Sequence, residues 1–160
     1  MHSYLSRRGL IAAVVLALSL APTLPSGASP LTDALDGDWA GSGVLRLTNG
    51  KTERIRCHAY IDASATEVDQ YFNCAGTDKN FSFSAFLRLS GNRVSGEWRG
   101  PDRSGTASGR ASASRLKLAL TSTRGSGNLT ANVGRCTQSV RITGWSDKLR
   151  SLTVELQKEC

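Results

Sequence analysis

The sequence predicts an all-β protein, an antiparallel up-and-down meander of about ten strands closed or nearly closed into a barrel. Short segments alternate apolar and polar residues along most of the chain, and Gly, Asn, Pro and Ser separate them. No segment keeps the helical spacing of apolar residues for long. Because closure pairs both edge strands, we prefer a barrel to a two-sheet sandwich, which shows the same alternation and is the alternative.

The first two strands form a hairpin. The first strand is read in DWAGSGVLRL and the second in KTERIRCHAYI, and Asn49-Gly50 between them supplies the residues that a tight turn requires. The residues predicted to face inward are Trp39, Gly41, Gly43, Leu45, Leu47, Ile55, Cys57, Ala59 and Ile61.

The middle of the chain continues the alternation. DQYFNCAG is the third strand, and FSFSAFLRLS and RVSGEWR form the next hairpin around Gly91-Asn92. The inward residues of these three segments are Phe72, Cys74, Phe81, Phe83, Ala85, Leu87, Leu89, Val94, Gly96 and Trp98. After the loop RGPDRSG, the strands TASGRAS, RLKLALTS, NLTANV, CTQSVRIT and LRSLTVELQKEC complete the meander.

Residues 1–28 have the features of a signal peptide. A basic segment precedes the apolar run GLIAAVVLALSLA, which is shorter than the roughly 20 residues that span a bilayer, and small residues follow it. We therefore expect a periplasmic or secreted protein with no membrane span after cleavage. Residues 29–36 form a short lead, and residues 37–160 form a single barrel domain.

The charge of the chain is moderately basic. Of the 20 Lys and Arg residues, Arg7 and Arg8 lie in the signal peptide, which leaves 18 against 13 Asp and Glu. The basic residues are scattered singly and form no run, so we expect no nucleic-acid partner.

The four cysteines all follow the signal peptide, and in an exported chain they predict two disulfides. Pairing Ala59 with Phe72 sets Cys57 opposite Cys74. Pairing Val140 with Leu156 and Ile142 with Val154 sets Cys136 opposite Cys160. Both bridges, Cys57–Cys74 and Cys136–Cys160, are thus predicted within single hairpins.

The sequence offers no catalytic or metal-binding pattern. His58 is the one histidine after the signal peptide, and its strand phase is outward. No G-x-S-x-G elbow accompanies it, and the cysteines lack metal-ligand spacing. We therefore predict no catalytic residues, no metal and no cofactor.

The triplet Gly37-Asp38-Trp39 at the start of the first strand resembles the opening of the calycin barrels, which include lipocalins, avidins and small exported bacterial metalloprotease inhibitors. The resemblance implies that Trp39 plugs the closed end of the barrel under a basic residue from a late strand, for which Arg141 and Arg150 are the candidates. By resemblance to the inhibitors, SPLTDALDG would be the extended segment that enters a protease cleft.

The inward face combines small residues with aromatics. The small residues Gly41, Gly43, Ala107, Gly109 and Ala111 leave volume for a pocket, or they let a narrow barrel close around large neighbours. The preferred function is an exported, non-enzymatic binding protein whose barrel holds a small apolar ligand. The predicted pocket wall is Phe81, Phe83, Trp98 and Leu118. The alternative is a filled barrel that binds an envelope or secreted protein, such as a periplasmic protease inhibitor.

Overall fold

A computed structural model describes residues 29–144 and 147–160, so the predicted signal peptide lies outside the described residues. A short helix, α1 (Pro30–Leu35), precedes ten strands. The strands are β1 (Gly37–Leu47), β2 (Thr52–Ala63), β3 (Glu67–Ala75), β4 (Asn80–Ser90), β5 (Arg93–Arg99), β6 (Ser104–Ser112), β7 (Arg115–Ser122), β8 (Gly125–Val133), β9 (Thr137–Thr143) and β10 (Leu149–Gln157).

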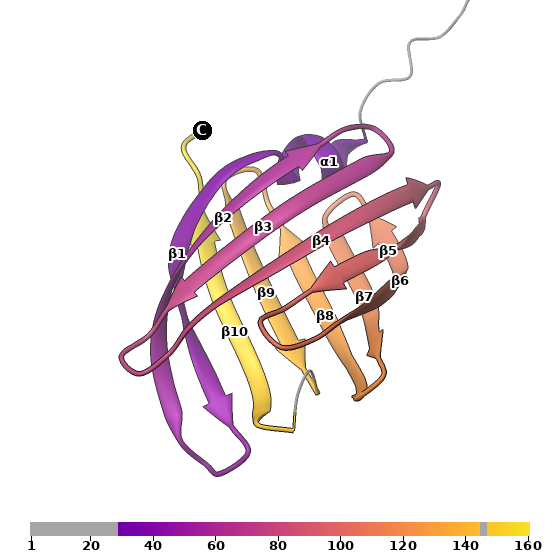
Figure 1. The fold of residues 1–160 in the computed structure, drawn as a ribbon. Helices are drawn as coiled ribbons and strands as arrows, with labels where there is room; N and C mark the ends of the chain where they lie inside the picture. The colour runs from indigo at the N-terminus through magenta and orange to yellow at the C-terminus, as the bar shows by residue number, and fades with distance from the viewer. Residues whose placement is uncertain (1–28, 145–146) are drawn as a thin grey trace, which may run out of the picture.

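The ten strands form a closed antiparallel barrel. Each strand pairs with its neighbours in sequence, and β1 also pairs with β10, which completes the ring (Figure 1). The predicted meander is confirmed, and the alternative two-sheet sandwich is wrong, because the β1–β10 ladder leaves no open edge.

Small residues at inward positions allow adjacent strands to pack closely against one another. A Cβ atom at Gly41 would overlap the carbonyl of Glu155, and one at Gly109 would overlap the carbonyl of Lys117. The space that these glycines leave is therefore occupied by the backbone of the adjacent strand. Of the two interpretations of the small residues, the structure supports tight closure around large side chains.

Both predicted disulfides are present. Cys57 is directly opposite Cys74 in the β2–β3 ladder, where Ala59 pairs with Phe72 as predicted.

Cys136 is bonded to Cys160, but the predicted register of the β9–β10 hairpin is wrong by two residues. Val140 pairs with Val154 rather than with Leu156. Extending this register sets Cys136 opposite Lys158, whose N–H donates to the Cys136 carbonyl. The bridge forms because residues 158–160 lie beyond the end of β10, where the Cα atoms of Cys136 and Cys160 are 5.9 Å apart. Alternation along a strand does not encode this irregularity.

Helix α1 occupies the predicted lead and was not expected as a helix. The Ser29 side chain accepts from the Thr32 N–H at the helix start, and Pro30 occupies the first turn, where its missing N–H costs nothing. Leu31, Thr32 and Leu35 are buried against the barrel. One helical turn and a half is too short to show periodicity in the sequence, so only burial against the barrel reveals it.

Candidate functional site

The two ends of the barrel differ, and one of them is closed. Figure 1 shows α1 at the end where the C-terminus lies. Trp39, which is 1% exposed, donates its indole N–H to the Leu35 carbonyl at 2.8 Å. The resemblance predicted a tryptophan at a closed end, and Trp39 occupies that position beneath α1.

The basic residue over Trp39 is Lys158. Its ammonium lies 4.8 Å from the centroid of the Trp39 ring and donates to the carbonyls of Ala34 at 2.8 Å and Asp36 at 2.6 Å. Lys158 thus joins the C-terminus to the end of α1 and to the tryptophan. The candidates Arg141 and Arg150 are wrong, because both are exposed on the outer face of the barrel. Lys158 follows the last strand, so strand phase gave no indication of its direction.

The interior of the barrel is filled. Phe83, Trp98 and Leu118 line a residual cavity of about 10 Å³, and the rings of Phe83 and Trp98 are stacked with centroids 5.9 Å apart. A cavity of this volume accommodates at most one water molecule. The structure brings these three predicted residues together as core, with no preformed space for a ligand between them.

A buried amide also lines this cavity and was missed in the sequence. Gln138 is 3% exposed, and its Oε1 atom has no hydrogen-bond partner among the described residues. Strand phase marks Gln138 as inward, since Val140 and Ile142 on the same face of β9 are buried. A buried amide oxygen without a hydrogen bond lowers the stability of the folded protein. The Gln138 side chain is therefore an unfavourable polar group beside the residual cavity.

The opposite end of the barrel has an open mouth. A depression of about 480 Å³ lies there, and Phe81 is in its wall, one inward position above Phe83 on β4. The apolar part of the wall is Leu45, Leu47, Phe81, Pro101 and Leu149, and the polar part is Asp78, Lys79, Asn80, Asp102 and Lys148. Phe81, predicted with the other pocket residues, is thus separated from them and belongs to the mouth.

Hydrogen bonds fix the loops around this mouth. The Glu53 carboxylate accepts from the Asp78 N–H at 2.9 Å, which holds the β3–β4 turn against β2. Thr48 donates its hydroxyl to the Asp147 carbonyl at 2.9 Å and its N–H to the Lys148 carbonyl at 3.0 Å. These bonds tie the β1–β2 turn to Asp147 and Lys148 ahead of β10.

His58 lies on the outer face, as predicted from strand phase, and it is exposed. Its neighbours there include Tyr60 and Tyr71, which pair across β2 and β3 and are 56% and 51% exposed. Within residues 29–144 and 147–160, no three His, Cys, Asp or Glu side chains gather to hold a metal ion. No helix in this described part has the length and apolar character to cross a membrane.

Comparison with known proteins finds solved structures with a similar fold. No protein-family model matches the sequence, and no curated protein matches it significantly. The crystal structure of Rv2717c from M. tuberculosis is similar, with a TM-score of 0.66, 13% identity, and 79% of this chain and 94% of that chain covered. The S-type phycobiliprotein lyase CPES from Guillardia theta is also similar, with a TM-score of 0.57, 10% identity, and 84% and 96% covered. At these identities the likeness shows the fold alone, a closed antiparallel β-barrel.

Proposed function

We propose that the protein is an exported, non-enzymatic binding protein that holds a small apolar ligand in the open mouth of its barrel. The observation that carries the proposal is the depression of about 480 Å³ at the end that α1 does not close. Ligand sites of soluble proteins have volumes of about 300–1,000 Å³, are mainly apolar, and occur in the mouths of β-barrels. Because the core beneath the mouth is filled, the proposed ligand binds at the rim and not in the barrel interior.

The lining of the mouth indicates the chemistry of the ligand. Leu45, Leu47, Phe81 and Leu149 offer apolar contact, and Phe81 is half-buried, so part of its ring remains accessible. The charged groups on the rim are two acidic and two basic side chains. This balance favours a ligand with an apolar body and no large net charge.

The other predicted pocket residues support the mouth from below. Phe83 lies one inward position deeper than Phe81 on β4, and Trp98 is stacked on it. Leu118 contributes to the same packed layer. In this proposal they form the floor that fixes the orientation of Phe81, and the ligand contacts Phe81 directly.

Two further features agree with export and with binding rather than turnover. Two disulfides are typical of oxidising compartments, which supports a periplasmic or secreted location. The exposed His58 is far along β2 from the mouth, and the cysteines are bonded to each other. Among the described residues, the wall of the mouth includes no Ser, Thr, Cys or His side chain.

The test is a fluorescence titration with the neutral apolar probe N-phenyl-1-naphthylamine. We expect saturable binding to the wild type, and we expect Phe81→Ala to weaken it by about tenfold, since it removes a large aromatic contact. Phe86→Ala is the matched control, because Phe86 is on the same strand with the outward phase. His58→Ala should leave binding unchanged. Absence of saturable binding, or equal weakening by both phenylalanine variants, would overturn the proposal.

The second candidate function is binding of an envelope or secreted protein, favoured by the Tyr60–Tyr71 pair. These are the large hydrophobic side chains that the described part of the chain exposes, and tyrosine is enriched in protein interfaces. The inhibitor form of this function requires an extended lead, but residues 30–35 are helical and docked on the barrel. A partner would therefore contact the outer face of β2 and β3. Co-purification that Tyr60→Ser with Tyr71→Ser abolishes, without effect on probe binding, would favour this candidate.

A further inference from the structure

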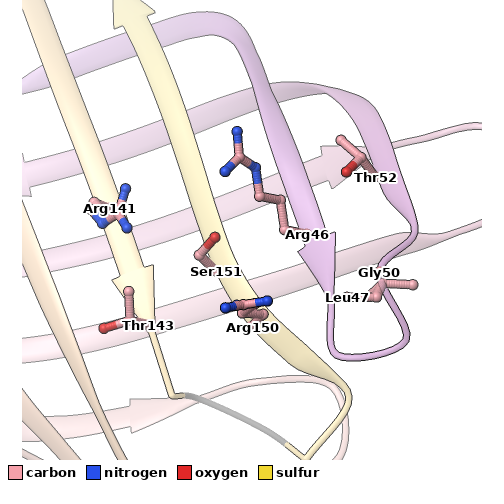
Figure 2. Close-up of a pocket in the computed structure, with 8 residues that line it drawn as sticks. All are labelled: Arg46, Leu47, Gly50, Thr52, Arg141, Thr143, Arg150 and Ser151. Atoms are coloured by element: carbon pink, nitrogen blue, oxygen red, sulfur yellow. The ribbon is translucent and has the colours of Figure 1, made fainter.

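A second depression, on the outer face of the barrel, gathers three arginines. It has a volume of about 540 Å³ and lies over β1, β10 and β9. Figure 2 shows the guanidinium groups of Arg46, Arg141 and Arg150 on these three adjacent strands, with Ser151 between them. The other lining residues are Leu47, Gly50, Thr52 and Thr143.

Strand register explains why the arginines share one surface. Arg46 of β1 pairs with Ser151 of β10, and Arg141 of β9 pairs with Thr153 of the same strand. Adjacent strands are about 4.8 Å apart, so the backbones of β1 and β9 flank β10 at roughly 10 Å, within reach of two arginine side chains.

A β-bulge adds the third arginine. Between Arg46 and Leu47 the β1–β10 register shifts, since Arg46 pairs with Ser151 whereas Leu47 pairs with Leu149. Arg150 is the extra residue of the bulge, and it is exposed next to Ser151, which is only 8% exposed. Bulges often re-aim a side chain in this way. The bulge therefore directs the exposed Arg150 and the buried Ser151 to the same outer face of β10.

None of the described residues that line this depression is acidic. The ion pairs found in the described part of the chain, Arg88 with Glu67 and Arg103 with Asp102, do not involve these arginines. On β10 the next outward carboxylate, Glu155, is paired in register with Ser42 and lines a different depression. Like charges on neighbouring strands repel one another, so an anion bound between the arginines would reduce the electrostatic repulsion between their guanidinium groups.

The chain segment that contains β6 to β9 carries charge of one sign. Residues 103–146 contain seven Lys and Arg and no Asp or Glu. Along the outer face, Arg141 pairs with Thr130, Thr130 with Lys117, and Lys117 with Arg110. A field of one sign attracts anions and raises their local concentration at a surface site.

We propose that Arg46, Arg141 and Arg150 bind a phosphate group on the outer face of the barrel, with hydroxyls of Ser151 and Thr143 as additional donors. Guanidinium groups are planar forks of donors that match phosphate oxygens in pairs, and they remain charged at every physiological pH. The phosphate group belongs either to a small soluble phosphate or to a phospholipid headgroup. This site is separate from the apolar mouth and does not depend on it.

The experiment measures binding of inorganic phosphate by calorimetry, with sodium chloride at equal ionic strength as the reference. We expect saturable binding that the double variant Arg46→Gln, Arg141→Gln weakens by about tenfold or more, since each charge-assisted contact contributes appreciably. The charge-matched control is Arg93→Gln, Arg99→Gln, both exposed on β5. It should bind as the wild type does. Far-UV circular dichroism and an unchanged urea unfolding midpoint in both double variants report an intact barrel, whether or not the mouth binds an apolar probe.

A second arm identifies the source of the phosphate. Sedimentation with vesicles of phosphatidylglycerol in phosphatidylcholine, compared with phosphatidylcholine alone, tests the headgroup. Vesicle binding that the Arg46 and Arg141 changes abolish assigns the site to a headgroup, and phosphate binding without vesicle binding assigns it to a soluble phosphate. If neither ligand binds, or if the two double variants lose binding equally, the proposed site is wrong.

Discussion

Truncation of Phe83 tests whether the barrel is filled. Phe83 is 4% exposed, its ring is stacked on Trp98, and the cavity beside it has a volume of only about 10 Å³. Because the neighbours are strands of a closed ladder, they have little freedom to collapse into the space of the ring. We expect Phe83→Ala to lower the free energy of unfolding by about 3–5 kcal/mol. Loss of the ring pair accounts for about 0.5–1.5 kcal/mol of that change.

The assay is urea denaturation at fixed pH with the disulfides intact, followed by far-UV circular dichroism. Phe86→Ala is the matched control, since Phe86 is on the same strand and its ring contacts the Arg88 guanidinium at 4.8 Å on the outer face. The control should lose only about 1 kcal/mol. A loss under about 1 kcal/mol for Phe83→Ala would show that the core around Phe83 is not filled, because it would place the ring beside open, hydrated space.

Three further variants test the closed end and the disulfides. Trp39→Phe keeps an aromatic side chain but replaces the indole with a smaller phenyl ring and removes the N–H that donates to α1, and we expect it to cost about 1–3 kcal/mol in the same denaturation assay. Lys158→Met removes both bonds to the carbonyls at the end of α1, so amide exchange of residues 31–36 should accelerate while the strands remain protected. Replacing Cys57 and Cys74 together with Ala should destabilise the barrel by about 2–5 kcal/mol, whereas an unchanged unfolding midpoint would contradict a stabilising bridge.

The strands were predictable because a barrel imposes strict alternation between a filled interior and solvent. That constraint marked Phe72, Phe83 and Trp98 as inward and His58 as outward, and all four phases are confirmed. It also set Cys57 opposite Cys74 correctly, because a short hairpin leaves little freedom of register.

Features that depend on tertiary contact were not predictable in this way. Alternation is unchanged by a shift of two residues, so the β9–β10 register was wrong although the cysteine pairing was right. The direction of Lys158 and the helical form of residues 30–35 follow from docking onto the closed end. The volume beside Gly41 is set by the backbone of β10, so the sequence alone did not decide between a barrel with a pocket and a barrel with a filled core.

The position of a bound apolar probe distinguishes a ligand site at the mouth from one elsewhere on the barrel. The measurement is a titration of ¹⁵N-labelled protein with N-phenyl-1-naphthylamine, followed by amide chemical shifts. We expect the shift changes to concentrate at the open mouth, on Leu45, Leu47, Phe81 and Leu149. Shift changes centred on α1 or on the Tyr60–Tyr71 face, or the absence of any shift changes, would contradict a ligand site at the mouth.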